Sequence, residues 1–533
     1  MLMSFRLGLS ILGCALSSLT MANTASVNQL PENLADLPST IDKALIQFHT
    51  PGMSVGIIKD GKIVYLDGHG MRDMANQRPV EPDTYFRLAS TSKAFTATTV
   101  AQLVDEGKLT WDTKVTEVLP AFQMADPWVT REMDITDLLT HRSGLVSGAG
   151  DAMLWPEPSG FSRDEIIHNL RYLTPAYSFR RHYAYSNVMY ITAGEVVATL
   201  TEQPWETRLQ QNVFAPLHMQ CFGGDVPADV LANRALSYGY NDERGIYPIP
   251  RNQIESKGIV SAAAGGVTCN APGMLRWLQM WLDGGKLPSG EPLLAPDTVK
   301  TMLSAQTILP VDETDEQWDN THFKAYGLGW RLMDIYGHEV ISHTGTLSGY
   351  QTYVAFIPDL QLGVVVLNNG SNYGARGSVM QTILKAYIAE APQEDWIAKY
   401  QDYRDEREAK SLARYQEPKG SGTTSLALDA YLGTFEDQWF GTFTLSQKGQ
   451  SIRIVSAKMP TLKGTLEPFD NNTFVIRWDN QNAASDAFIR FDTDYLKQIT
   501  GFSLYPYTVR KTTQHEWRDM YFNKVLAVTS LSN

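Results

Sequence analysis

A change in sequence pattern near residue 420 is the feature that most constrains how this chain folds. Residues 418–424 read PKGSGTT, a run of proline, glycine and small polar residues typical of a linker. Before this run, long helical patterns alternate with strand-like runs, whereas after it short alternating runs are separated by regular turns. We therefore expect two folded parts, a larger domain of mixed helices and strands and a small all-β barrel.

The 533 residues are enough for more than one domain, and four segments are predicted. They are a signal peptide over 1–22, a main domain over 30–392, a helical connector and linker over 393–425, and a barrel over 426–533. We assign the main domain to the α/β (α+β) class, with an antiparallel sheet flanked by helices and a helical subdomain. Its strand-like runs are 53–59, 62–68, 326–333, 339–343, 350–357 and 363–368.

The first residues indicate an exported protein, either periplasmic or extracellular. Arg6 supplies a short basic region, and residues 7–19 are apolar but interrupted by glycine and serine, which is too short a run to span a membrane. Small residues up to Ala22 offer a cleavage site. Residues 11–14 also resemble a bacterial lipoprotein box, so anchoring to a membrane through a lipidated Cys14 stays open as an alternative.

Charge and cysteine content exclude several classes of function. The formal net charge is −13, and an acidic surface argues against nucleic acid as a partner. Cys221 and Cys269 are the cysteines outside the leader. They could form one disulfide, but free buried thiols are at least as consistent with the spacing. The sequence has no Cys/His cluster at zinc spacing, and the pair His338 and His343 does not match H-E-x-x-H.

A predicted helix start at Ser90 carries the strongest chemical signal. Ser90 and Lys93 form a Ser-x-x-Lys pattern, and Gly107 ends the helical pattern that follows. Apolar residues recur in it at helical spacing, at Ala94, Ala97, Val100, Ala101 and Val104. Ser90 and Lys93 are then one turn apart on one face. An amine in that position can activate a serine when burial or a neighbouring charge lowers its pKa.

Two further motifs follow in chain order. Tyr185 and Asn187 form a Tyr-x-Asn pattern between two predicted helices, and His343, Thr344 and Gly345 follow on a predicted strand. Together, Ser-x-x-Lys, Tyr-x-Asn and His-Thr-Gly resemble the motifs of the penicillin-recognising serine hydrolases. The resemblance is strongest to the class C β-lactamase-like branch, which includes DD-peptidases, D-aminopeptidases and esterases.

The resemblance covers roughly residues 35 to 390 and implies a serine β-lactamase-like fold. The region after residue 426 resembles the lipocalin-like accessory domain attached to some of these enzymes. The implied substrate is a small molecule or short peptide, and no metal or organic cofactor is implied.

The resemblance also implies a role for each motif residue. Ser90 would attack a carbonyl and form an acyl-enzyme, while Lys93 would hold or relay its proton. Tyr185 would protonate the leaving group, and Asn187 would orient Lys93 and the substrate amide. The backbone N–H groups of Ser90 and Thr346 would form the oxyanion hole.

His343, Thr344 and Gly345 would bind the polar end of the substrate, and His343 departs from the lysine common at its position. A histidine in ordinary surroundings titrates near neutrality, so we expect it to bind a substrate carboxylate only when protonated. This favours a peptidase or esterase acting on amides or esters of small peptides. A β-lactamase and a non-catalytic penicillin-binding sensor remain alternatives.

Two other residues have simpler interpretations. Gly52 to Gly56 match G-x-S-x-G, but that motif requires a strand before the serine and a helix after it. Here a strand begins at the motif and a hairpin follows, so Ser54 is expected to lie in a strand. His141 is the last residue of a short predicted helix and is expected to brace a loop rather than take part in chemistry.

Overall fold

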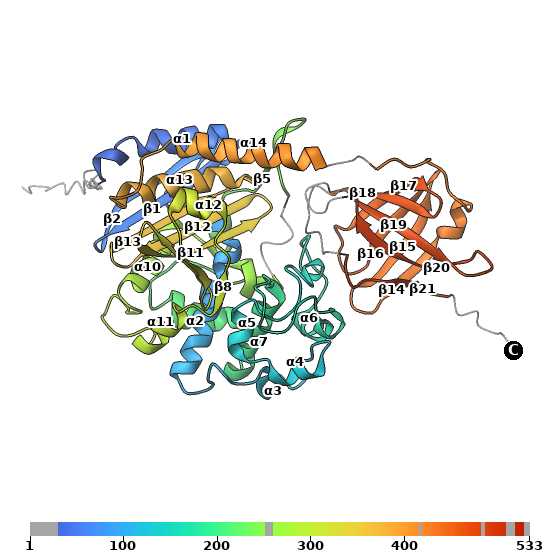
Figure 1. The fold of residues 1–533 in the computed structure, drawn as a ribbon, viewed down its shortest axis with the longest axis horizontal. Coiled ribbons are helices and arrows are strands. Elements are labelled where there is room, and N and C mark those ends of the chain that lie inside the picture. Colours follow the sequence, from blue (N-terminus) through green and yellow to red (C-terminus); the bar gives the residue numbers. More distant parts are fainter. Residues whose placement is uncertain (1–29, 251–258, 415–417, 481–485, 508–516, 527–533) are drawn as a thin grey trace, which may run out of the picture.

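The computed structural model describes residues 30–250, 259–414, 418–480, 486–507 and 517–526. The predicted signal peptide over 1–22 and Cys14 lie outside these ranges. Within the ranges, none of the helices combines the length and apolar character that a membrane span needs. Figure 1 shows a large domain of helices and strands joined by α14 to a small barrel, which confirms the predicted fold class.

The described part of the large domain is built on a nine-stranded antiparallel sheet. In spatial order its strands are β3 (Arg78–Pro79), β2 (Lys62–Asp73), β1 (Gly52–Lys59), β13 (Leu362–Asn368), β12 (Tyr350–Ile357), β11 (His338–Leu347), β10 (Arg331–Ile335), β9 (Lys324–Tyr326) and β8 (Thr307–Leu309). Asp60 and Gly61 both have positive φ, 51° and 73°. That is the conformation a tight hairpin turn needs, so the predicted β1–β2 hairpin is confirmed. Ser54 is buried in β1, as expected.

Two strand predictions near the motifs are wrong in their limits. The run 326–333 is not one strand, because β9 ends at Tyr326 and β10 begins at Arg331. Between them, Gly329 has φ +83°, and a Cβ there would lie 3.1 Å from the carbonyl oxygen of Lys93. The break therefore lets this loop pass directly against the helix that carries Lys93. The predicted strand 339–343 is too short, since β11 continues to Leu347.

Helices cover both faces of the sheet. On one face lie α1 (Leu37–Gln47), α13 (Tyr373–Tyr387) and α14 (Trp396–Arg414), and on the other lies α10 (Ala271–Leu282) (Figure 1). The central strand β13 is apolar along its length: Val364 and Val366 pack in one hydrophobic core, whereas Val365 and Leu367 pack in the other. This alternation is expected for a strand buried on both faces.

The remaining described elements of the large domain form the helical subdomain and its connections. The helices are α2 (Ser92–Asp105), α3 (Val115–Val118), α4 (Pro127–Glu132), α5 (Ile135–Leu139), α6 (Arg163–Asn169), α7 (Asn187–Thr201), α8 (Trp205–Leu209), α9 (Ala228–Ala232), α11 (Pro296–Met302) and α12 (Glu313–Asp319). Short helical turns are η1 (Glu32–Leu34), η2 (Ala89–Thr91), η3 (Asp151–Met153), η4 (Leu170–Tyr172), η5 (Gln210–Phe214) and η6 (Ala262–Gly266). Two small sheets pair β4 (Phe86–Arg87) with β7 (Thr268–Cys269) and β5 (Tyr238–Asn241) with β6 (Gly245–Pro248).

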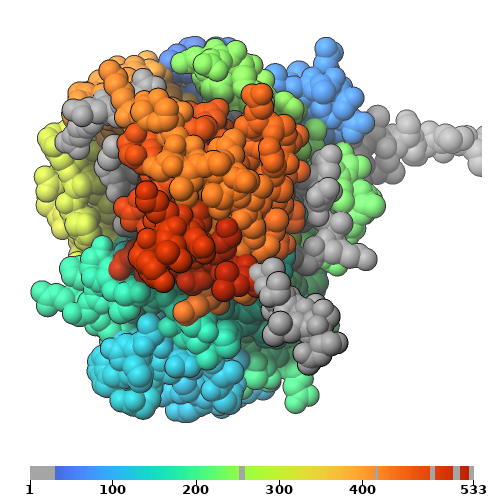
Figure 2. All heavy atoms as spheres, turned by 90° about the vertical axis from the view of Figure 1, so that its right-hand side faces the viewer, coloured from blue at the N-terminus to red at the C-terminus, as the bar shows by residue number. Residues whose placement is uncertain are grey.

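The C-terminal part is a closed antiparallel barrel with eight strands among the described residues. After η7 (Leu428–Tyr431) these are β14 (Gly433–Asp437), β15 (Gly441–Lys448), β16 (Ser451–Ser456), β17 (Lys463–Asp470), β18 (Thr473–Trp478), β19 (Ala487–Thr493), β20 (Ile499–Pro506) and β21 (Phe522–Lys524). Pairing of β14 with β21 closes the barrel. Figure 2, viewed from the barrel side, shows the barrel in orange and red over the centre of that face.

Cys221 and Cys269 form a disulfide, with their Cα atoms 4.4 Å apart. The sequence left this pairing open, because residues 48 apart along the chain can be brought together only by the fold. The bond ties the segment before α9 to β7. That strand pairs with β4, which leads directly to Ser90.

Candidate active site

The nucleophile candidate lies on a constrained turn. Ser90 is in η2, the single turn that leads from β4 into α2. Ala89 just before it has φ +50°, a left-handed conformation that is uncommon for a residue with a side chain. The backbone N–H of Leu88 donates to the carbonyl of Val267, and the Thr91 hydroxyl donates to the Leu88 carbonyl. These bonds hold the strained turn in place from both sides.

Gly345 explains how the His-Thr-Gly strand reaches this turn. A Cβ at Gly345 would lie 2.1 Å from the carbonyl oxygen of Leu88 and 2.3 Å from the Thr352 hydroxyl. A side chain at this position would therefore push β11 away from η2. Glycine permits the close approach, which brings Thr344 and Thr346 of β11 to the Ser90 turn.

Lys93 lies at the centre of the site and is completely buried. Its Nζ donates to Asn187 Oδ1 at 2.7 Å, to the carbonyl of Ala264 at 2.7 Å and to Ser90 Oγ at 3.4 Å. Ala264 belongs to η6, so this turn of alanine and glycine residues supplies an acceptor to the lysine. Burial lowers the pKa of Lys93 to about 7. The amine is therefore neutral in a substantial fraction of molecules near neutral pH.

Tyr185 faces Lys93, with its ring centroid 4.7 Å from Nζ. Burial raises the pKa of the phenol far above its ordinary value, although the charge of Arg331 and the Ser90 hydroxyl favour the ionised form. The phenol is therefore protonated near neutrality. His141 braces this segment as expected, because its Nδ1 accepts a hydrogen bond of 3.0 Å from the backbone N–H of Ser186.

The expectation that His343 changes charge near neutrality is wrong. The side chain is completely buried, and burial together with Arg331 and Lys93 holds its pKa well below its usual range. Nδ1 lies 2.8 Å from the carbonyl oxygen of Thr344, and Nε2 lies 3.0 Å from the Tyr326 hydroxyl. A carbonyl only accepts, so Nδ1 carries the proton and Nε2 accepts from the tyrosine. His343 is therefore neutral, and its two hydrogen bonds connect Tyr326 of β9 to the backbone of β11.

Arg331 supplies the positive charge that His343 lacks, and sequence analysis did not single it out. Its Nη1 donates to Thr344 Oγ1 at 2.8 Å. Its charge also acts on Tyr185 and on Lys93. No motif marks Arg331 in the sequence, because it enters the site from β10, the strand beside β11, and the sheet register alone places it opposite Ser342.

Asp151 is the second residue that sequence analysis did not single out. Both oxygens of its carboxylate accept from Asn187 Nδ2, at 3.1 and 3.0 Å. The residue begins η3, directly after a loop that contains Gly148 and Gly150. The sequence holds no signal for its role, because nothing in the pattern says that this loop returns to the Tyr-x-Asn segment.

A family model described as Beta-lactamase matches residues 37–386, which is well over half of the chain. This chain belongs to the beta-lactamase family. It is an enzyme of the serine hydrolase superfamily that also contains the penicillin-binding proteins. A second model, described as a domain of unknown function (DUF3471), matches residues 417–520, which lie mostly in the barrel.

Curated relatives of this beta-lactamase family member include two of different origin. Unguisins hydrolase ungD' of Aspergillus campestris is 29% identical over 421 residues, covering 75% of each chain. Penicillin-binding protein 4 of Amycolatopsis lactamdurans is 28% identical over 349 residues, covering 64% of this chain and 86% of the relative.

Solved structures with the same fold include one that spans both domains. The octameric penicillin-binding protein homologue from Pyrococcus abyssi has a TM-score of 0.59 at 19% identity, covering 92% of this chain and 100% of that one. The D-amino acid amidase from Ochrobactrum anthropi SV3, complexed with D-phenylalanine, has a TM-score of 0.54 at 23% identity. It covers 67% of this chain and 100% of its own.

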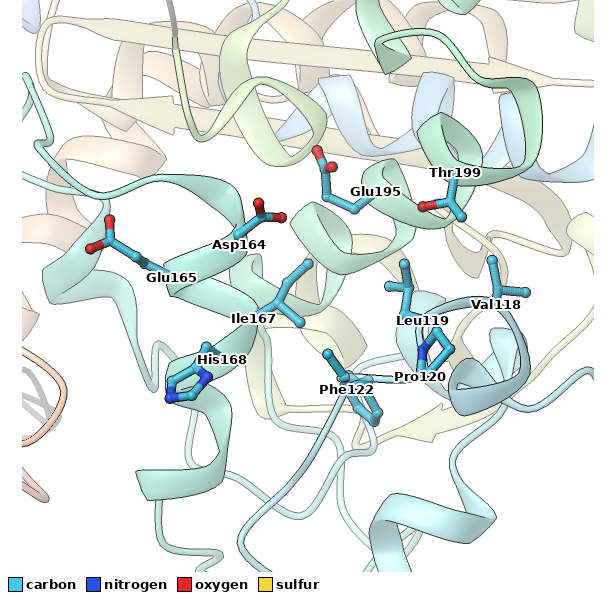
Figure 3. A pocket seen from close by; sticks show the side chains of 11 residues that line it. Val118, Leu119, Pro120, Phe122, Asp164, Glu165, Ile167, His168, Glu195 and Thr199 are labelled. Carbon is cyan, nitrogen blue, oxygen red and sulfur yellow. The ribbon is translucent and has the colours of Figure 1, made fainter.

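This beta-lactamase family member also has a hollow in its helical subdomain, separate from the catalytic candidates (Figure 3). Its lining combines apolar side chains with carboxylates from α6 and α7. The lining residues are Val118, Leu119, Pro120, Ala121, Phe122, Asp164, Glu165, Ile167, His168, Glu195 and Thr199. None of the motif residues lines it, so the candidate site is the Ser90 cluster.

Proposed function

We propose that this enzyme hydrolyses amide or ester bonds of small peptide-like substrates through an acyl-enzyme on Ser90, in the manner of D-aminopeptidases, DD-peptidases and esterases. The observation that carries the proposal is the buried Lys93 amine. It lies 3.4 Å from the Ser90 hydroxyl, and its pKa is lowered to about 7. An amine with this pKa is half neutral at pH 7 and can accept the serine proton.

The proposed acylation step uses neutral Lys93 as the base and protonated Tyr185 as the acid. Neutral Lys93 takes the proton of Ser90 as Oγ forms a bond to the substrate carbonyl carbon. The backbone N–H groups of Ser90 and Thr346 stabilise the oxyanion. The bond to the leaving nitrogen or oxygen then breaks, and Tyr185, which is protonated near neutrality, gives its proton to that atom. Proton transfer from Lys93 restores the phenol.

Deacylation repeats these steps with water. The water oxygen bonds to the acyl carbon as its proton passes through Tyr185 to Lys93, which is neutral again. The bond from that carbon to Ser90 Oγ then breaks, and Lys93 gives the proton to Oγ. The same pair of groups therefore serves both halves of the reaction, as microscopic reversibility requires.

Arg331 and Thr344 indicate the polar end of the substrate. A guanidinium is charged across the whole working range and matches the geometry of a carboxylate. The Arg331 guanidinium lies within hydrogen-bond distance of Thr344 Oγ1. Thr344 is on β11, the strand that also carries Thr346, the proposed oxyanion donor. We propose that the preferred substrates carry a carboxylate near the scissile bond and that Arg331 binds it.

β-Lactam hydrolysis is the second candidate, and Arg331 is the observation that favours it. The sequence argued against a β-lactamase because His343 lacks a fixed charge. Arg331 supplies one next to Thr344. Turnover of nitrocefin tests this candidate, and slow acylation without turnover would instead support the penicillin-binding sensor.

Replacing the nucleophile tests the proposal as a whole. Ser90→Ala is expected to abolish hydrolysis and labelling by a fluorophosphonate probe. The fold should survive, because the change removes only one hydroxyl. Ser54→Ala is the matched control, since its hydroxyl is buried in β1, and it should keep both activities. Labelling that persists in Ser90→Ala would move the nucleophile elsewhere.

The carboxylate proposal is tested with paired substrates. Arg331→Met is expected to reduce kcat/KM at least tenfold, about 1.4 kcal/mol, for a D-alanyl-D-alanine peptide. The corresponding peptide amide, which lacks the carboxylate, should lose much less. Equal losses on both substrates would mean that Arg331 maintains the site and does not bind the carboxylate.

A further inference from the structure

Asp151 determines which way the Asn187 amide points. A carboxylate can only accept, so the two hydrogen bonds from Asn187 Nδ2 direct the NH₂ group toward Asp151. The amide oxygen is then left for Lys93, whose Nζ donates to it at 2.7 Å. Without a carboxylate at position 151, the amide could turn and present its NH₂ group to the lysine.

The charge of Asp151 also acts on Lys93 directly. It favours the protonated amine and so opposes burial and the charge of Arg331, which both lower the pKa. The other titratable groups facing Lys93 from neighbouring elements are the phenols of Tyr185 and Tyr190 and the imidazoles of His141 and His343. Burial keeps the phenols protonated and the imidazoles neutral near pH 7. Asp151 is thus the carboxylate whose charge acts on Lys93 among the described residues.

The segment that begins at Asp151 ends on the barrel. The Thr461 hydroxyl donates to the carbonyl of Pro156 at 3.1 Å, and the backbone N–H of Gly160 donates to the carbonyl of Lys458 at 2.7 Å. The Lys458 ammonium also lies 2.5 Å from Glu165 on α6. A stretch of ten residues therefore connects the catalytic amide to the barrel, with a hydrogen bond to the barrel at each of two points along it.

We propose that Asp151 is a positioning residue, which acts on Lys93 through Asn187, and that the barrel holds the segment 151–160 in the place where Asp151 can do so. The inference deepens the proposed function, because it rests on Lys93 as the base that activates Ser90. It gives the C-terminal barrel a role in the chemistry of a site to which it contributes no side chain among the described residues.

The pH dependence of Ser90 labelling tests the role of Asp151 without any choice of substrate. The rate of labelling of the full-length protein by a fluorophosphonate should rise with pH as Lys93 loses its proton. Asp151→Asn removes a nearby negative charge, so this rise should shift to lower pH by about one unit. The plateau rate should also fall, by about tenfold, because the Asn187 amide is no longer oriented.

Asp164→Asn is the matched control. It removes the same charge from an exposed position on α6 and should leave the profile in place. An Asp151→Asn profile with an unchanged midpoint overturns the inference, whereas a wild-type enzyme that is not labelled at any pH overturns the proposed function itself.

A double-mutant cycle tests the role of the barrel. Lys458→Met with Thr461→Val removes side-chain contacts to Glu165 and Pro156. It should lower the plateau labelling rate about threefold and shift the midpoint in the same direction as Asp151→Asn. In the Asp151→Asn background it should have no further effect, because both changes act through one residue.

Lys463→Met is the control on the barrel. Lys463 is exposed on β17, and its replacement should change neither the plateau labelling rate nor the pH midpoint. Fully additive effects of the barrel and Asp151 changes, or an unaltered rate in the barrel variant, would show that the barrel does not act through Asp151.

Discussion

At the scale of single residues, Lys93 combines a cost in stability with a gain in reactivity. Its pKa falls from 10.5 to about 7 on folding, mainly because the amine is buried. Between these two values the unfolded chain binds a proton that the folded protein does not. Lys93 therefore makes the free energy of unfolding increase as the pH rises from about 7 to 10.5.

Lys93→Met should remove this pH dependence. Methionine fills similar space without a titrating group, so the variant should lack the rise in unfolding free energy between pH 7 and pH 9 that the wild type shows. Urea denaturation at the two pH values measures it. Lys410→Met, on an exposed lysine of α14, should retain the wild-type rise. A rise of equal size in Lys93→Met would contradict the lowered pKa.

His343 gives a second prediction at this scale. The imidazole is neutral and both of its nitrogens are within hydrogen-bond distance of Tyr326 or Thr344. His343→Gln should therefore leave the pH midpoint of kcat/KM unchanged for both a carboxylate substrate and its amide. Paired pH–rate profiles of wild type and His343→Gln check this. If a pH-dependent change in kcat/KM is lost in the variant only for the carboxylate substrate, His343 is the charged group that binds the carboxylate.

At the scale of elements, the segment 151–160 is held against strand β4, which leads to the nucleophile, by a buried ion pair. Glu157 lies 3.1 Å from Arg87 of β4, and their side chains are only 4% and 2% exposed. Removing one partner of a buried pair leaves the other charge without its counter-ion in a medium of low dielectric. The pair therefore holds the segment against β4, three residues before Ser90.

Glu157→Ala should destabilise the protein by about 3–5 kcal/mol. An exposed pair on α14 provides the comparison: Glu406→Ala removes a carboxylate 3.4 Å from Lys410 and should cost less than about 0.5 kcal/mol. Chemical denaturation of both variants measures the difference. Similar small losses would mean that Arg87 is stabilised by other groups and that Glu157 does not anchor the segment.

At the scale of the whole molecule, the two domains share one hydrophobic core. The cluster that contains α2 and α7 extends without a break to the interior of the barrel. Phe161 lies with its ring centroid 6.1 Å from that of Phe440, and Asn169 Nδ2 donates to the Trp439 carbonyl at 2.8 Å in a buried position. The linker therefore joins two packed bodies (Figures 1 and 2).

Phe161→Ala should weaken the packing between the large domain and the barrel. Loss of a buried phenylalanine costs about 3–5 kcal/mol, and here the cost falls on the interface between the domains. The wild type should unfold in one calorimetric transition, and the variant should show a second, earlier one as the barrel separates. Phe488→Ala, within the barrel and away from Phe161, should shift the transition without splitting it. A single unshifted transition in Phe161→Ala would contradict the shared core.

The sequence by itself determined the parts of this protein that depend on local order. The Ser-x-x-Lys spacing placed Ser90 and Lys93 one turn apart at the start of a helical segment. A two-residue turn at Asp60 formed the hairpin, and a proline- and glycine-rich linker preceded the barrel. The tertiary structure alone decided the rest. The register between β10 and β11 places Arg331 in the site. The loop before η3 brings Asp151 back to Asn187, and the fold brings Cys221 and Cys269 close enough to form a disulfide. Charge at the site is decided there too, because burial, which no local pattern encodes, makes Lys93 a base and keeps His343 neutral.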